Sequence, residues 1–217
     1  FYRSADQTVI FGKETNATMA RLPSGGKGAG SISFRTKSAD AVASLRNPII
    51  AATVTVSGRS NADGNAPTRN TATINRTIQV GTDLGFSSYS SRVLGPFTNT
   101  GPVPPQANSE TTYTLVFDFT ATVNSLAGAT AKGVLPPYVR FVGATSPNDG
   151  SITFDEATRT VTWAAGEVAA GTTSTAPKRG AFQVALLPSF SQQGTSPILM
   201  SSVSYSATDR YTKRLLE

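Results

Sequence analysis

The 217-residue sequence contains no histidine and no cysteine. Without these side chains a protein cannot build a Ser-His-Asp triad, a Cys-His pair, a disulfide, or a zinc or haem site with imidazole or thiolate ligands. Most of the common routes to catalysis are thereby excluded. The sequence predicts that the chain is not an enzyme and that it has no catalytic, metal-binding or cofactor-binding residues and no cofactor.

Charged residues are also few, at 15% of the chain, and long apolar runs are absent. No segment reaches the ~20 apolar residues that cross a bilayer, and residues 1–11 have neither the basic nor the apolar region of a signal peptide. The net charge is +6, but the basic residues are scattered singly apart from 178–179 and 210–214. No basic stripe interleaved with aromatic residues is present, so we expect no direct membrane span and no nucleic-acid partner.

Carboxylates and asparagines are the remaining candidates for site chemistry. Asp155 and Glu156 are neighbours in a hairpin turn, where adjacent side chains point to opposite faces and into water, so they do not predict a glycosidase pair. The polar turn 61–65 carries oxygen ligands without the spacing of a calcium loop. Asn16 and Asn75 begin Asn-x-Thr sequons and are candidate N-glycosylation sites.

What the sequence does contain is the pattern of many short β-strands. Residues 112–119, TYTLVFDF, place Leu115 and Phe117 on one face of a half-buried strand. Residues 151–163 predict a hairpin whose two strands bring their apolar residues to one face. Further strands are predicted at 84–93, 138–144, 181–187 and 198–207. This count of about seven or eight strands predicts an Ig-like β-sandwich over residues 83–217. Its predicted core contains Leu115, Phe117, Phe141, Phe154, Val161 and Trp163.

Trp163 is the only tryptophan of the chain. An inward-facing tryptophan on a hairpin strand can bury about 200 Å² and stabilise the core of a small sandwich. The alternative is a solvent-facing ring that grips a sugar, and it needs other exposed aromatic side chains such as Tyr89, Tyr138 or Tyr205 nearby. The alternation of apolar and polar residues favours the core position.

The first 82 residues contain fewer strands. They are predicted at 7–12, 30–37, 49–58 and 72–81. Four strands leave one apolar face open unless something covers it, and on strand 49–58 this face carries Ile50, Val54 and Val56. We therefore expect an all-β protein of two Ig-like β-sandwich domains in tandem, with residues 1–82 forming a partial or small domain and residues 83–217 a full one.

Residues 128–172 resemble the conserved-repeat domain of large bacterial and archaeal cell-surface proteins, an Ig-like domain of unknown function. The motifs that carry the resemblance are Leu135-Pro136, Phe141-Val142, Val161-Thr162-Trp163 and the turn from Gly166 to Gly171. The chain as a whole is most similar to the terminal repeats of giant surface proteins of small-genome candidate-phylum bacteria. Residues 1–37 resemble the end of a preceding repeat, with Phe11 at the tryptophan position.

This resemblance implies a structural subunit or module of an extracellular, cell-surface assembly such as a filament, an appendage or a surface layer. We expect its partners to be copies of the chain or other repeats of the same polypeptide. The alternative function is an adhesin or a carbohydrate-binding surface module that makes contact through the loop 95–110.

The strand count also predicts how assembly occurs. The strands missing from residues 1–82 are expected from an earlier part of the polypeptide or from a neighbouring subunit that donates a strand to an open sheet edge. The segments 8–11 and 210–216 are candidate donors. The candidate assembly residues are Ile50, Val54, Val56, Val9 and Phe11.

Overall fold

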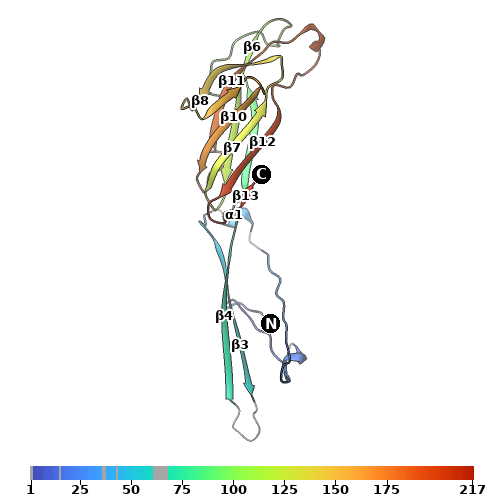
Figure 1. Cartoon of the computed structure of the whole chain (residues 1–217), viewed down its shortest axis with the longest axis vertical. Helices are drawn as coiled ribbons and strands as arrows, with labels where there is room; N and C mark the ends of the chain where they lie inside the picture. Colours follow the sequence, from blue (N-terminus) through green and yellow to red (C-terminus); the bar gives the residue numbers. More distant parts are fainter. Residues whose placement is uncertain (1, 15, 36–37, 43, 61–67) are drawn as a thin grey trace. The chain divides into compact units, whose positions relative to one another are not determined.

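The structure is a computed structural model that describes residues 2–14, 16–35, 38–42, 44–60 and 68–217. Nearly all of its regular structure is antiparallel β-sheet (Figure 1), which confirms the predicted all-β fold class. The chain divides into two compact units, Phe1–Ser38 and Ala39–Glu217. The division between the units follows Ser38, whereas the sequence predicted a domain boundary after residue 82.

The first unit has little regular structure. Strand β1 (Tyr2–Arg3) pairs with β2 (Thr8–Val9) in a two-stranded antiparallel sheet. A 3-10 turn, η1 (Ala17–Met19), begins after Asn16, whose side-chain oxygen accepts a hydrogen bond from the backbone N–H of Thr18 at 3.1 Å. This contact is a typical helix N-cap, in which a short polar side chain satisfies an otherwise unpaired amide.

The second unit starts with a short helix, α1 (Ala39–Val42), and a long hairpin made of β3 (Ile49–Ser60) and β4 (Thr68–Gln79). The two strands pair in continuous register, with Val54 opposite Ile74. The connecting residues 61–67, which include the predicted polar turn, lie outside the described residues. No other described strand pairs with β3 or β4.

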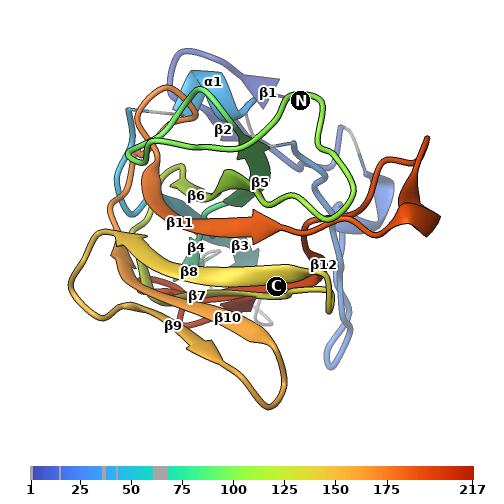
Figure 2. The same cartoon turned by 90° about the horizontal axis from the view of Figure 1, so that it is seen from above.

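The rest of the second unit is a β-sandwich of two antiparallel sheets that face each other (Figure 2). The four-stranded sheet has the order β5 (Leu84–Ser91), β6 (Thr111–Ala121), β11 (Lys178–Leu186), β8 (Val139–Ser146). The five-stranded sheet has the order β13 (Leu215–Leu216), β12 (Ser201–Asp209), β7 (Leu126–Val134), β10 (Thr160–Val168), β9 (Ile152–Asp155). A second 3-10 turn, η2 (Phe190–Gln192), lies between β11 and β12.

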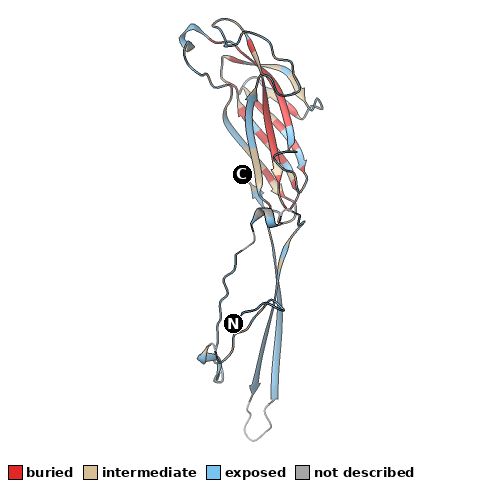
Figure 3. Ribbon diagram, turned by 180° about the vertical axis from the view of Figure 1, so that it is seen from behind, coloured by how far each residue is buried: buried red, intermediate tan, exposed pale blue. Residues whose placement is uncertain are grey.

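The core fills the space between the two sheets (Figure 3). Trp163 of β10 is 1% exposed, and its ring centroid lies 5.5 Å from that of Phe119 on β6. Because the indole is inside the sandwich, the alternative of a solvent-facing ring that grips a sugar is wrong. Of the other predicted core residues, those that are buried are Leu115, Phe117 and Val161, and those that are partly buried and pack against the core are Phe141 and Phe154.

Candidate assembly interface

One face of the β3–β4 hairpin is mainly aliphatic and exposed. The pairing register brings Ile50 opposite Ile78, Ala52 opposite Arg76 and Val54 opposite Ile74, and Val56 follows on the same face, so one arginine interrupts the aliphatic row. Ile50 is half-buried, while the exposed fractions of the other four large aliphatic residues run from 47% for Ile74 to 66% for Val56. Figure 3 shows the hairpin as exposed along its length. An isolated two-stranded hairpin is at best marginally stable in water, so this face has the properties of an interface.

The opposite face of the hairpin is polar. The hydroxyl of Thr53 donates to the side-chain oxygen of Asn75 at 2.8 Å, and the hydroxyls of Thr55 and Thr73 lie 3.2 Å apart. Such cross-strand pairs stabilise a hairpin without needing to be buried. Asn75 therefore belongs to the exposed polar face, and Asn16, the other sequon asparagine, accepts hydrogen bonds from Thr18 at η1.

The base of the hairpin is hydrogen-bonded to the sandwich. The backbone N–H of Asn47 donates to the carbonyl of Val123 at 3.2 Å, and the two ends of the hairpin are joined to each other by the backbone N–H of Val80, which donates to the carbonyl of Pro48 at 3.0 Å. The side chain of Asn124 donates to the carbonyl of Val80 at 2.9 Å. Both ends of the hairpin are thus attached at the connection between β6 and β7.

Asp209, at the end of β12, is the fully buried acid at this attachment point. One of its carboxylate oxygens accepts from the backbone N–H of Thr82 at 2.9 Å and from the side chain of Asn124 at 2.8 Å. The other accepts from the backbone N–H groups of Tyr211 at 2.8 Å and Thr212 at 3.1 Å. Burial raises the pKa of this carboxyl, but the hydrogen bonds from Asn124 and the three backbone groups outweigh burial and hold the pKa below its ordinary value.

The candidate assembly residues of the first unit lie partly exposed. Val9 is in β2, and the ring of Phe11 lies beside Gly30. The strand predicted at 30–37 contains Ile32 and Phe34, although neither was named as an assembly residue. The structure forms no strand over residues 30–35, the described part of this range, and both side chains are exposed there. Apolar residues at every second position are typical of a strand, but the pattern does not show whether a pairing partner is present.

The candidate donor segment 210–216 is in use within the sandwich. Leu215 and Leu216 form β13, which pairs with Thr208 and Ala207 of β12. Leu216 also packs against the core. This end of the segment is therefore part of the five-stranded sheet.

The loop 95–110, the predicted contact surface of an adhesin, packs on the outer face of the four-stranded sheet (Figure 2). The Asn99 side chain donates to the hydroxyl of Thr114 on β6 at 3.0 Å. The Gln183 side chain of β11 donates to the carbonyl of Thr98 and to the side-chain oxygen of Asn99, both at 3.0 Å. The beginning of this loop thus stabilises the sandwich, because it provides hydrogen-bond partners for buried polar groups on the sheet.

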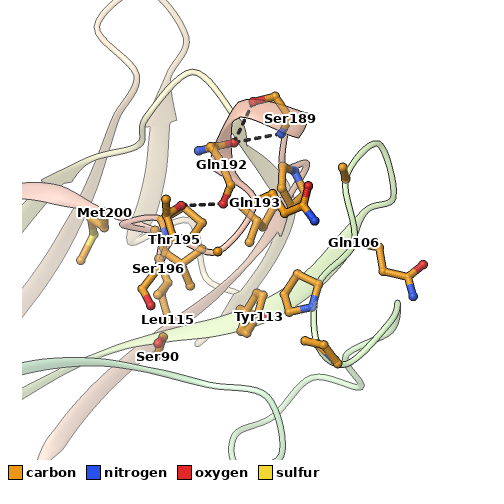
Figure 4. A pocket seen from close by; sticks show the side chains of 18 of the residues that line it. Ser90, Gln106, Tyr113, Leu115, Ser189, Gln192, Gln193, Thr195, Ser196 and Met200 are labelled. Atoms are coloured by element: carbon orange, nitrogen blue, oxygen red, sulfur yellow. Dashed lines mark hydrogen bonds between the residues drawn. The ribbon is translucent and has the colours of Figure 1, made fainter.

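Part of the same loop borders a groove with a cavity volume of about 1150 Å³. Figure 4 shows lining residues of the groove on two different connections, Gln106 on the loop before β6 and Gln193 on the segment around η2, and Tyr113 and Leu115 also line it. None of the described residues that line the groove is charged. A groove of this kind suits an uncharged ligand or an extended polypeptide segment.

The adjacent carboxylates behave as turn residues. The Asp155 side chain accepts from the hydroxyl of Thr158 and the backbone N–H of Ala157, both at 2.9 Å. The hydroxyl of Thr158 and then the backbone N–H groups lower the pKa of Asp155. A general acid needs the opposite shift, so the geometry of this turn favours a structural role for Asp155.

No family model and no curated protein matches the chain. The resemblance to the cell-surface repeat family therefore stays a prediction from the sequence motifs. In the part of the chain that the structure describes, no helix is long and apolar enough to cross a membrane.

Proposed function

We propose that the chain is a structural module of an extracellular surface assembly, such as a filament, an appendage or a surface layer built from β-sandwich repeats. In this assembly, neighbouring copies or repeats make contact through the apolar face of the β3–β4 hairpin. The observation that carries the proposal is the uncovered row of Val54, Val56, Ile74 and Ile78, beside a sandwich whose own core is closed.

The energetics support this division of roles. Fully burying a valine or isoleucine side chain contributes roughly 1.5 to 3 kcal/mol, so covering one that is about half exposed contributes about 1 kcal/mol. The four exposed side chains together can supply several kcal/mol, while the polar face of the hairpin stays in water. A two-stranded hairpin with this pattern can pack its aliphatic face against a neighbouring molecule while its threonine face stays in water.

The test is the double variant Val54→Thr plus Val56→Thr. Threonine keeps the β-branched shape and the strand propensity of valine but adds a hydroxyl. We expect the wild-type chain to self-associate in sedimentation velocity runs over a concentration series and to form ordered assemblies in electron micrographs. The double variant should associate at least about tenfold more weakly.

The matched control is Thr55→Ser on the polar face of the same strand, which should associate like the wild type. A wild-type chain that stays monomeric at every concentration, with no ordered assembly in micrographs, contradicts the proposal. Equal weakening by the control variant also contradicts it, because the apolar face would then have no special part.

The groove supports a second candidate, a carbohydrate-binding surface module. It is uncharged, and it combines amide side chains such as Gln106 and Gln193 with the ring of Tyr113, which are the groups that bind sugar hydroxyls and sugar faces. Binding on a glycan array that is lost in Gln106→Ala plus Gln193→Ala, and kept in a Val93→Ala control outside the groove, would favour this candidate.

A further inference from the structure

Residues 8–57 repeat the order of the segments that form β10, β11 and β12 in the sandwich. TVIF at 8–11 matches TVTW at 160–163, so that Phe11 corresponds to Trp163. PIIAATVTVS at 48–57 matches PILMSSVSYS at 197–206 without a gap. Between the two matches lies GSISF at 30–34, in the place that KRGAFQVAL holds in the sandwich.

A glycine fixes the register of this middle segment. In the sandwich, a Cβ built on Gly180 would lie 2.6 Å from the ring of Trp163. In the first unit, a Cβ built on Gly30 would lie 3.7 Å from the ring of Phe11. The contact at Gly30 is an ordinary van der Waals distance and the one at Gly180 leaves no room for a side chain, but in both cases a glycine lies beside the aromatic ring at the matching position, so we align Gly30 with Gly180. Counting on by two residues at a time, Ile32 corresponds to Phe182 and Phe34 to Val184.

The sandwich shows what covers these positions when a repeat is complete. Strand β11 pairs with β6 along its whole length, with Gly180 opposite Phe117 and Phe182 opposite Leu115. The ring centroids of Phe182 and Phe117 lie 5.5 Å apart, and Phe182 and Val184 are fully buried. Strand β6 thus supplies the backbone partner on one edge of β11 and part of its apolar cover, while β8 pairs with the other edge.

The corresponding residues of the first unit lack such a cover. Ile32 is 56% exposed and Phe34 is 61% exposed. Within the described ranges, residues 27–35 belong to no strand, so their extended backbone offers N–H and C=O groups for pairing. An extended segment with unpaired backbone groups and apolar side chains at alternate positions can bind a further strand by β-augmentation.

We propose that residues 27–35 are the unpartnered counterpart of β11 and that they bind a strand with the pattern of β6. The bound strand runs antiparallel to residues 30–34, places a large apolar residue opposite Gly30 and covers Ile32 and Phe34. The strand β6 of the same sandwich is already paired on both sides, with β5 and β11, so the partner is a strand with the β6 pattern that lies outside this sandwich and has a free edge. This inference rests on the proposed function, because it names the partner that such a module takes.

Charge and size agree with this partner. Residues 28–34, GAGSISF, carry no charge, and the first five residues after Lys27 are small apart from Ile32. The inner face of β6 presents the large apolar side chains of Leu115, Phe117 and Phe119, and of these Phe117 has a glycine opposite it on β11. The match between large residues on one strand and glycines on the other is the one that Phe117 and Gly180 make in the sandwich.

The test uses the full-length chain and a synthetic peptide of residues 109–121, which contains the β6 sequence. Hydrogen exchange read by mass spectrometry follows the backbone amides of residues 30–34. We expect fast exchange in the chain alone and about tenfold or greater protection when the peptide is added. Ile32→Asp plus Phe34→Asp should remove the protection, whereas Val93→Asp, at an exposed site of the sandwich, should leave it unchanged.

The proposal is overturned if the peptide adds no protection, or if a scrambled peptide protects equally well. It is also overturned if residues 30–34 are already fully protected in a chain that sedimentation shows to be monomeric, because the segment would then be paired within its own chain. The peptide experiment does not depend on the hairpin face. A chain that binds the peptide but does not self-associate therefore disproves the hairpin contact and supports this strand site. A chain that self-associates but does not bind the peptide supports the hairpin contact and disproves the strand site.

Discussion

Gly180 of β11 faces the indole ring of Trp163 on β10 so closely that a Cβ on the glycine would come within 2.6 Å of the ring atoms Cδ2 and Cε2. The backbone of Gly180 is in an ordinary conformation, since its φ is not positive. A glycine is therefore required at this position because the indole fills the space that a side chain would need. The contact between the two residues packs the two sheets closely against each other.

The first prediction is that Gly180→Ala destabilises the sandwich by about 1 to 3 kcal/mol, because the added methyl group overpacks the core. Urea unfolding followed by the fluorescence of Trp163 measures this, since the only tryptophan reports on the sandwich. The matched control is Gly58→Ala in β3, where a built Cβ meets nothing within 4 Å. An equal loss of stability in both variants would show that the space beside Trp163 is not the cause.

The second prediction concerns the indole itself. Trp163→Phe leaves a void beside Phe119 and Gly180 and should lower the free energy of unfolding by about 1 to 3 kcal/mol. Circular dichroism in urea is the measurement, because the variant has no tryptophan. Phe190→Leu, at an exposed aromatic residue in η2, should change the free energy by less than about 0.5 kcal/mol. A larger effect at Phe190 than at Trp163 would contradict the assignment of the core.

The third prediction concerns the loop on the outer face of the four-stranded sheet. Asn99→Ala removes the partner of Thr114 and one partner of Gln183, and both of these residues are buried. Leaving buried polar groups unpaired should cost about 1 to 3 kcal/mol. Faster hydrogen exchange in residues 95–101, with unchanged exchange in β7 and β10, would locate the effect. Unchanged exchange in the loop would show that Asn99 does not hold it.

The same strand, β6, shows how far the sequence can predict the fold. The alternation of TYTLVFDF identified Leu115 and Phe117 as inward-facing, because the strand period is two residues. It also placed Thr114, Val116 and Asp118 on the exposed face of a half-buried strand, yet Thr114 is fully buried. Thr114 is covered by the loop 95–110, whose Asn99 donates to its hydroxyl. A tertiary contact of this kind leaves no periodic signal in the sequence of the strand.

At the candidate interface, too, the sequence predicted which residues share a face but not which strands pair. Alternation placed Ile50, Val54 and Val56 on one face of a strand, and this is where they lie. It could not show that β3 pairs with β4 alone among the described strands, because pairing depends on register and on which other strands are present. The relation between Gly30 and Phe11 also needed coordinates, since a glycine in a sequence does not reveal which ring lies against it.

The last prediction follows from the buried carboxylate of Asp209. Its pKa is lower in the folded chain than the ordinary value of about 3.9. A group of this kind contributes stability that is fully present above the unfolded pKa and is lost as the pH falls through the folded pKa. The wild-type chain should therefore keep its contribution from Asp209 at pH 7 and lose it progressively below about pH 4.

Asp209→Asn tests this directly. The new amide group would turn a donor toward Thr82 and Asn124 or toward Tyr211 and Thr212, all of which are themselves donors. We expect a loss of about 2 to 4 kcal/mol at neutral pH, and a smaller difference from the wild type at pH 3, where protonation weakens the wild-type contacts too. Asp83→Asn, at a neighbouring exposed aspartate, should stay within about 0.5 kcal/mol of the wild type. Urea midpoints measured from neutral to acidic pH give the answer: a difference between wild type and Asp209→Asn that is the same at both ends of the series would show that the charge of Asp209 does not hold the attachment between the hairpin and the sandwich.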